Sequence, residues 1–313
     1  MAIGGLGAIA SHEVPEPKVR RAFVTGATGF LGQRVACELL DRGVEVHASR
    51  HRMAPAEGSG LIWHDLDLAS ASAVRRVLAA VRPDALVHLA WNVGPDYQSS
   101  PNNDAWAKWS AILAREFVRS GGRRILMAGS CAEYDWAEMP LSEASPCRPG
   151  NRYGAAKLSL FQEVRELADD RVTVVWPRLF FLFGEGERPG RVIPRIIRDV
   201  ESGQDIDWIS SDLRRDYLHA DEAASAIAHL SMTGADGVVN VASGEAPTVT
   251  EIAQMVARAL GKGEPSVSGA QGPTSGPVEI RADASRLARL GWTPTRTVAE
   301  ALASLSLATA GNH

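Results

Sequence analysis

A glycine-rich turn near the start of the chain constrains the fold more than any other feature of the sequence. The apolar run Arg21–Thr25 predicts a strand, and it leads directly into Gly26-Ala27-Thr28-Gly29-Phe30-Leu31-Gly32. Gly26 permits a tight turn, Gly29 lets the backbone approach a pyrophosphate, and Gly32 lets the following helix pack close to the strand. The helix predicted over Gly29–Asp41 would point its free N–H groups at the phosphates. Strand, glycine turn and helix in this order predict a dinucleotide-binding unit.

Short β-rich runs alternate with helical patterns through the first half of the chain. Further strands are predicted over Val44–Ser49, Ala85–Ala90, Arg124–Gly129 and Val172–Pro177. Between them, helices are predicted over Ser70–Val81, Asp104–Ser120 and Tyr153–Ala168. This alternation predicts βαβ units, and therefore an α/β fold with a Rossmann-type, doubly wound, mainly parallel sheet covered by helices on both faces.

The pattern weakens after Pro177, where residues 184–194 are rich in Gly and Pro. An apolar strand returns over Gly237–Ser243, and helices are predicted over Glu251–Leu260 and Ala282–Leu290. We expect a flexible leader over 1–20 and a dinucleotide-binding domain over 21–178, to which 209–243 return. A smaller C-terminal substrate-binding lobe would comprise 179–208 and 244–305. Ligands of open α/β sheets bind at the carboxyl edge of the strands, where this lobe would lie.

Composition excludes several classes of function. The formal net charge is −4 and the chain has no basic run, so no nucleic-acid or membrane surface is expected. Cys37, Cys131 and Cys147 have no CxxC spacing, which argues against a disulfide framework or a metal site. No apolar run approaches the roughly 20 residues that span a bilayer, and the N-terminus lacks the features of a signal peptide. We therefore expect a cytoplasmic protein.

The end of the second predicted strand indicates which dinucleotide is bound. An acid there would bind the ribose 2′-hydroxyl of NAD, whereas a nearby Arg suits the 2′-phosphate of NADP. Ser49 stands where the acid would be, and Arg50 follows, so NADP(H) is favoured. The alternative is that Arg50 and Arg52 are solvated loop cations. Further on, Asp65-Leu66 ends another short apolar run, and Asp65 could accept a hydrogen bond from the adenine amine.

Three side chains form a candidate catalytic set. Tyr153 and Lys157 open a predicted helix four residues apart, so both can address one bound cofactor. A neighbouring ammonium favours phenolate and lowers the pKa of a tyrosine, which suits Tyr153 to proton exchange with an alkoxide. Ser130 follows a buried strand, where its hydroxyl could hold the reacting oxygen near Tyr153.

Together these motifs resemble the extended short-chain dehydrogenase/reductase family, in its nucleotide-sugar 4-ketoreductase and epimerase branch. Besides the glycine turn, Ser130, Tyr153 and Lys157, the resemblance rests on Val87-His88-Leu89-Ala90 and Arg215-Asp216-Tyr217-Leu218-His219-Ala220-Asp221. It runs from about residue 21 to residue 303. It implies that Ser130, Tyr153 and Lys157 are the catalytic triad.

The resemblance also implies further site residues and partners. The cofactor contacts would include Thr28, Phe30, Leu31, Leu66, Leu89, Ala90, Lys157 and Pro177. Arg215 would contact a substrate diphosphate, and the segment around Arg191 and Val192 would line a sugar-nucleotide pocket. Related enzymes pair through the helices that start near Asp104 and Tyr153, so a homodimer is expected.

Local residues narrow the reaction. Dehydratases of this family carry an Asp-Glu pair after the catalytic hydroxyl residue, and this chain has Cys131-Ala132 instead. Glu133 stands one place further on and would point to the opposite face if the strand continued. Cys131 could act as an acid or base, or simply fill space. Trp91 and Phe181 could form apolar walls against a 6-deoxy methyl group, or pack the lobes together.

The reaction expected from these features is NADPH-dependent reduction of the 4-keto group of a nucleoside-diphosphate 4-keto-6-deoxysugar. An NAD-dependent nucleotide-sugar epimerase is the first alternative. A non-catalytic, NADP-sensing protein that has kept the fold is the second.

Overall fold

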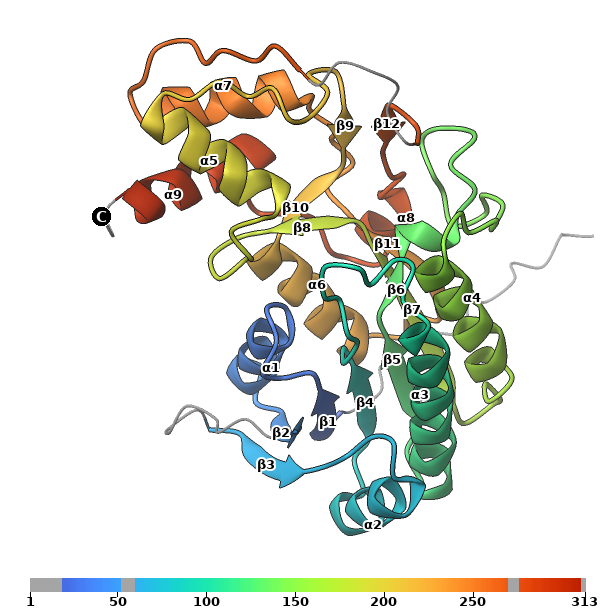
Figure 1. The fold of residues 1–313 in the computed structure, drawn as a ribbon. Helices are drawn as coiled ribbons and strands as arrows, with labels where there is room; N and C mark the ends of the chain where they lie inside the picture. Colours follow the sequence, from blue (N-terminus) through green and yellow to red (C-terminus); the bar gives the residue numbers. More distant parts are fainter. Residues whose placement is uncertain (1–18, 52–59, 270–275, 311–313) are drawn as a thin grey trace, which may run out of the picture.

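The computed structural model describes residues 19–51, 60–269 and 276–310. Its centre is an eight-stranded sheet in which all strand pairs are parallel (Figure 1). Seven strands follow in the order β11-β7-β5-β4-β1-β2-β3, and β6 pairs with β7. Their bounds are β1 Arg21–Thr25, β2 Glu45–Arg50, β3 Ile62–Asp65, β4 Ala85–His88, β5 Arg124–Met127, β6 Gly129–Ser130, β7 Thr173–Leu179 and β11 Gly237–Val241.

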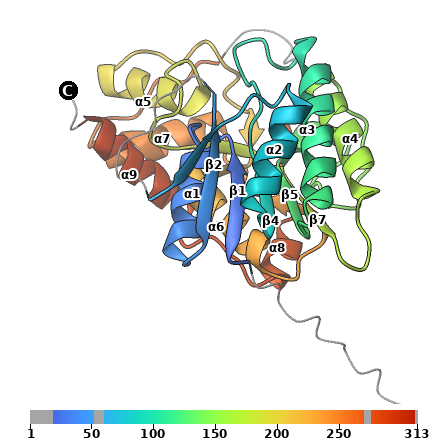
Figure 2. The same ribbon diagram turned by 90° about the horizontal axis from the view of Figure 1, so that it is seen from below.

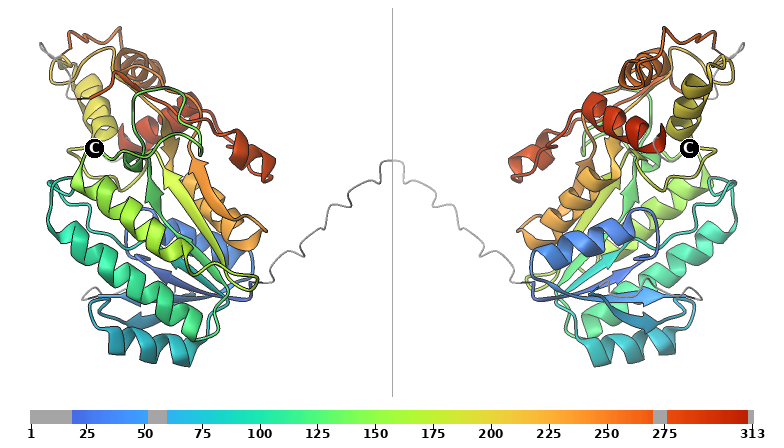
Figure 3. Two further views of the ribbon diagram at one scale, coloured as in Figure 1. Left: turned by 90° about the vertical axis from the view of Figure 1, so that its right-hand side faces the viewer. Right: turned by 90° about the vertical axis from the view of Figure 1, so that its left-hand side faces the viewer.

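Helices cover both faces of this sheet, as Figures 2 and 3 show from below and from the sides. One face packs against α1 (Gly32–Asp41), α6 (Ala220–Met232) and α8 (Ser285–Arg289). The other packs against α2 (Ala71–Val81), α3 (Asn102–Arg119) and α4 (Arg152–Arg165). Strands buried on both faces are mostly apolar, and β4 and β5 each have three consecutive apolar residues and one buried polar residue, His88 and Arg124. The predicted fold class is confirmed.

The strand order reverses between β1 and β4. From β1 the chain proceeds outward through β2 and β3, then returns to β4 and builds the other half of the sheet. The connections diverge at this point, and the crevice at the carboxyl ends of such strands is where doubly wound sheets bind ligands.

A smaller lobe lies beyond the carboxyl end of β7, at the top of Figure 1. It contains α5 (Val192–Ser202), α7 (Val249–Ala259) and α9 (Val298–Ala310), which share their own apolar core. Two short strand pairs connect it to the sheet: β8 (Phe181–Phe183) with β10 (Tyr217–His219), and β9 (Arg214–Arg215) with β12 (Glu279–Ile280). Because β8 begins two residues after β7 ends, the lobe sits directly above the sheet edge that the sequence predicts to bind ligands.

Several predicted elements need correction. The helix predicted from Gly29 begins at Gly32, because Gly26 has a φ of 76° and its carbonyl accepts the Gly29 N–H, which makes a turn of the preceding residues. The strand predicted over Arg124–Gly129 is divided into β5 and β6. The sequence did not predict α5, α6 or α9.

Most of the predicted leader, residues 1–18, lies outside the described residues. Its last two residues belong to the folded domain: Val19 is buried in the core beside β1, and the Arg20 N–H donates to the Asp84 carboxylate. None of the helices in the described ranges is long and apolar enough to span a bilayer.

Candidate active site

The glycine turn packs tightly against the end of β4. A Cβ on Gly26 would lie 2.7 Å from the Ala90 nitrogen and 2.9 Å from the Leu89 carbonyl carbon, so only glycine fits. The Leu89 N–H in turn donates to the Thr25 carbonyl at 3.2 Å. The residues predicted to hold the cofactor phosphates and nicotinamide ribose are therefore adjacent.

The N-terminus of α1 is suited to an anion. No side chain caps it, and no acidic side chain lies in its first turn. Thr28, Gly29, Phe30 and Leu31, which lead into it, are all at least partly exposed. The free N–H groups of a helix start carry partial positive charge, so these residues fit the pyrophosphate of a dinucleotide.

The outer end of the candidate site lies at the ends of β2 and β3. Arg50 Nε donates to Asp65 Oδ1 at 2.7 Å, and this hydrogen bond raises the pKa of Arg50 and lowers that of Asp65. Ser49 and Leu66 beside them are buried. Arg50 and Asp65 therefore form an exposed ion pair, although the sequence predicts Arg50 at the 2′-phosphate and Asp65 at the adenine.

The inner end lies where β6 meets α4. The side chains of Tyr153 and Ser130 interact, and Lys157 donates to the Ala128 carbonyl at 2.7 Å. Lys157 Nζ also lies 5.8 Å from the centre of the Tyr153 ring. Burial raises the pKa of Tyr153 and lowers that of Lys157 to about 7. The three predicted catalytic side chains therefore form one cluster, in which Ser130 and Lys157 are buried and Tyr153 is partly exposed.

Aromatic side chains from the segment between β4 and α3 cover this cluster. Trp91 lies with its ring centre 3.7 Å from Lys157 Nζ, a cation–π contact, and packs edge-on against Tyr153. Tyr97 packs edge-on against Tyr153 at 4.9 Å, and the Gln98 carbonyl accepts the Tyr153 N–H. Trp91 is therefore a wall of the catalytic cluster itself.

The substrate-side candidates form a second group. Phe181 packs against the apolar cluster that contains Cys131, and Arg215 lies 5.7 Å from the Phe181 ring and interacts electrostatically with Cys131. Burial raises the pKa of Cys131 to about 12, so its thiol is neutral at ordinary pH. A neutral buried thiol fits the space-filling alternative for Cys131.

Arg191 and Val192 stand at the start of α5. Arg191 pairs with Glu187 at 3.4 Å, and Arg191 and Arg215 both interact electrostatically with Tyr217. The structure therefore connects them to the Cys131 and Phe181 group through β10. Pro177 is buried inside β7, opposite Val239 of β11.

The prediction for Glu133 depended on a strand that continues past Ser130, and the structure does not meet that condition. The strand does not continue past Ser130, because residues Cys131–Glu133 form a 3₁₀ helix. The Glu133 carboxylate therefore turns back and accepts the Ser130 N–H at 2.7 Å, the Trp176 indole N–H at 3.0 Å and Arg178 Nε at 2.8 Å. The Ser-x-x-Glu spacing of a capping box was the signal for this arrangement.

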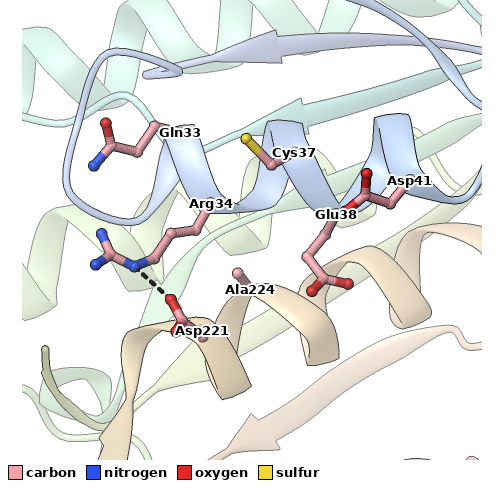
Figure 4. A pocket seen from close by; sticks show the side chains of 7 residues that line it. All are labelled: Gln33, Arg34, Cys37, Glu38, Asp41, Asp221 and Ala224. Carbon is pink, nitrogen blue, oxygen red and sulfur yellow. Dashed lines mark hydrogen bonds and ion pairs between the residues drawn. The ribbon is translucent and has the colours of Figure 1, made fainter. Parts of the chain in front are cut away.

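Arg34 of α1 ties the glycine turn to the lobe. It donates to the carbonyls of Phe30 and Glu185 and pairs with Asp221 at 2.7 Å. Beside it, an open groove of about 370 Å³ lies between α1 and α6 (Figure 4). The predicted catalytic and substrate residues do not line this groove, so we assign the active site to the clusters above.

Glu185, His219 and Asp221 place possible metal-ligand atoms within 4.8 Å of one another. Arg34 and Arg296 already pair with the Asp221 carboxylate of this group, so its charge is balanced within the protein. The absence of a metal site stays a prediction of the sequence.

Comparison with known proteins agrees with this geometry. Residues 22–242 match the family described as the NAD dependent epimerase/dehydratase family, and the chain belongs to this family of enzymes. It is 27% identical to the UDP-glucose 4-epimerase of Azospirillum brasilense, covering 88% of this chain and 87% of that one. It is 24% identical to the dTDP-4-dehydro-6-deoxyglucose reductase of Escherichia coli, covering 87% and 92%.

A solved structure shows the same fold. The UDP-glucose 4-epimerase of Thermotoga maritima superposes with a TM-score of 0.81 over 93% of this chain and 99% of that one, at 19% identity.

Proposed function

We propose that this enzyme reduces the 4-keto group of a nucleoside-diphosphate 4-keto-6-deoxysugar with NADPH. The observation that carries the proposal is the cluster of Ser130, Tyr153 and Lys157 at the carboxyl edge of the sheet, with Arg50 at the outer end of the same candidate cofactor site. The name of the relative from Escherichia coli, a reductase of such a sugar, supports the substrate class.

Each part of the cofactor has candidate residues. The turn Gly26–Gly32 and the start of α1 would hold the pyrophosphate, and Arg50 with Ser49 the 2′-phosphate. Asp65 and Leu66 would flank the adenine. The residues around the nicotinamide ribose would be Leu89, Ala90, Lys157 and Pro177. When bound, NADPH supplies the hydride that converts the ketone carbon to an alkoxide.

The catalytic side chains would then supply the proton to the reacting oxygen. Ser130 donates a hydrogen bond to the ketone oxygen and orients it, and Tyr153 gives that oxygen its phenolic proton. Lys157, held by the Ala128 carbonyl, stabilises the phenolate that remains. Dehydration has no support here, because Cys131 and Ala132 offer neither an acid nor a base at neutral pH.

The smaller lobe would hold the rest of the substrate. Arg215 and Arg191 would bind the diphosphate, with Val192 beside them, while Trp91, Phe181 and Cys131 enclose the sugar. Two arginines around one diphosphate suit its charge and its bidentate geometry.

We also propose a cytoplasmic homodimer that pairs through α3 and α4. These two helices pack side by side on one face of the sheet, and Trp106 and Trp109 of α3 are only partly buried. Free Cys37, Cys131 and Cys147 suit a reducing compartment.

An NAD-dependent nucleotide-sugar epimerase is the second candidate. Asp65 holds Arg50 in an ion pair, and several relatives, including that from Azospirillum brasilense, are named as UDP-glucose 4-epimerases. The two candidates differ in cofactor consumption, because an epimerase regenerates its dinucleotide in every turnover.

The test is to incubate the purified enzyme with 4-keto-6-deoxysugar nucleotides and follow the oxidation of NADPH or NADH. Stoichiometric oxidation of NADPH supports reduction. Purified protein that carries NAD and turns over substrate without added cofactor would support the epimerase instead.

A further inference from the structure

Glu133 is a fully buried acid beside the catalytic cluster that the proposed chemistry does not use. Its exposed fraction is 0%, and its carboxylate accepts hydrogen bonds from the Ser130 backbone, from Trp176 at both oxygens and from Arg178. A buried carboxylate that receives four hydrogen-bond contacts from three donor groups is held in one position. Arg178, itself 2% exposed, pairs with one of its oxygens at 2.8 Å.

The backbone of residues 128–130 joins this acid to the catalytic side chains. Lys157 donates to the carbonyl at one end of the segment, and Glu133 accepts the N–H at the other. Gly129 between them has no room for a side chain, since a Cβ would clash with Trp176 and lie 2.7 Å from Glu133 Oε1. Glu133 and Lys157 therefore both hydrogen-bond to the backbone of residues 128–130.

We propose that Glu133 is a positioning residue for the reaction: it fixes Ser130 beside Tyr153 and provides the counter-charge for the buried Lys157 ammonium. The inference rests on the proposed roles of Ser130, Tyr153 and Lys157 in catalysis. Glu133 would then contribute to catalysis as well as forming the capping box that follows β6.

The surroundings of Lys157 and Tyr153 leave Glu133 as their source of negative charge among the described residues. Burial lowers the pKa of His88 to about 3 and raises that of Cys131 to about 12, so both are neutral near pH 7. The titratable groups that interact with the pair are His88 of β4, Tyr97 after β4, and Cys131 and Glu133 after β6. Arg178, the ion-pair partner of Glu133, interacts in turn with Tyr134 and Cys147.

The direction of the electrostatic effect follows. The Glu133 charge favours the protonated forms of both Lys157 and Tyr153. Reduction needs both protons, so activity should fall as either group loses its proton at high pH. Removing the charge should make both protons leave at lower pH.

The experiment is the pH dependence of kcat for ketone reduction in Glu133→Gln. Glutamine keeps an oxygen for the Ser130 N–H but carries no charge. We expect the basic limb to move to lower pH by about one unit, and kcat at about pH 8 to fall about tenfold, with KM for the sugar nucleotide little changed.

Glu116→Gln is the matched control. Glu116 is another buried carboxylate with arginine partners, Arg75 and Arg119, but it lies on the far part of α3 and interacts with neither Tyr153 nor Lys157. We expect it to lower the melting temperature and leave the pH profile in place. If Glu133→Gln does not fold, Glu133→Gln combined with Arg178→Met removes both buried charges and should show a shift in the same direction.

A folded Glu133 variant whose basic limb stays where it is in the wild type would overturn the inference. Should the wild type oxidise no NADPH, the proposed reduction fails, and the inference is tested without turnover by the pH dependence of dinucleotide binding in calorimetry. Affinity that is lost at lower pH in Glu133→Gln than in the wild type supports it. Identical pH dependence in the two proteins refutes it.

Discussion

The two ends of the candidate cofactor site each carry an acid–arginine pair of nearly the same length. Glu133 and Arg178 lie 2.8 Å apart at the inner end, and Asp65 and Arg50 lie 2.7 Å apart at the outer end. The side chains of the inner pair are 0% and 2% exposed, whereas those of the outer pair are 80% and 30% exposed.

Burial gives the two pairs different uses. At the inner end water does not screen the charges, so the carboxylate acts on Tyr153 and Lys157 and cannot change partner without a large cost. At the outer end water competes for both side chains, so Arg50 can exchange Asp65 for a phosphate at little cost. Under the proposed function, the buried end would carry the chemistry and the exposed end would select the cofactor.

The largest effect is expected from Tyr153→Phe. Phenylalanine keeps the ring contacts with Trp91 and Tyr97 but has no proton to give, so kcat should fall by about 10²- to 10⁴-fold. Steady-state kinetics measure the loss, and an unchanged melting temperature shows that the fold is intact. A variant that retains most of its activity would remove the catalytic role from the inner end.

The next effect compares the two pairs directly. Glu133→Gln leaves Arg178 charged and unpaired inside the protein, which should lower the free energy of unfolding by about 3–5 kcal/mol. Asp65→Asn breaks the exposed pair and should leave stability unchanged within error. Urea unfolding measures the free energy of unfolding of both variants. Equal losses in the two variants would show that the buried and the exposed ion pair do not differ in their contribution to stability.

The pH dependence of stability tests the burial of Lys157. Its pKa is about 7 in the folded protein against 10.5 as the ordinary value, so between these pH values the unfolded chain binds more protons. Its contribution to stability therefore rises with pH across this window. The wild type should gain stability relative to Lys157→Met as the pH is raised from about 7.5 to 9.5. A constant difference between the two proteins would contradict a lysine whose pKa is lowered by burial.

The smallest effect concerns the outer end. Arg50→Ala should raise KM for NADPH by about 10- to 100-fold, because a charge-assisted hydrogen bond to the 2′-phosphate is lost. KM for NADH should not change, since that cofactor has no 2′-phosphate. Equal changes in KM for NADPH and NADH would mean that Arg50 does not bind the 2′-phosphate.

The sequence predicted the sheet half of the molecule better than the lobe. The glycine turn and the strand ends that carry Ser130 and Arg50 are local signals, and βαβ alternation is a strong pattern. Helix α5 was not predicted because Pro194 interrupts its apolar pattern, although proline is tolerated in the first turn of a helix. Helix α6 is alanine-rich and buried on most sides, so it shows little amphipathic period.

The side-chain contacts between different strands could not be predicted from the sequence. The pairing of Arg50 with Asp65 depends on the register of β2 against β3. The turn of Glu133 back onto Ser130 depends on where β6 stops, and Trp176 and Arg178 complete the pocket from a strand more than forty residues away. Such long-range contacts decide which of several polar residues is buried.

The most direct test of ketone reduction at the inner end is hydride transfer from labelled cofactor. The wild-type enzyme is incubated with NADPH that carries deuterium at the transferable position of the nicotinamide, together with a 4-keto-6-deoxysugar nucleotide. We predict one deuterium at C4 of the product sugar for each NADPH oxidised, and far slower formation of this product with Tyr153→Phe. Product formation without deuterium at C4 and without loss of NADPH would contradict the account.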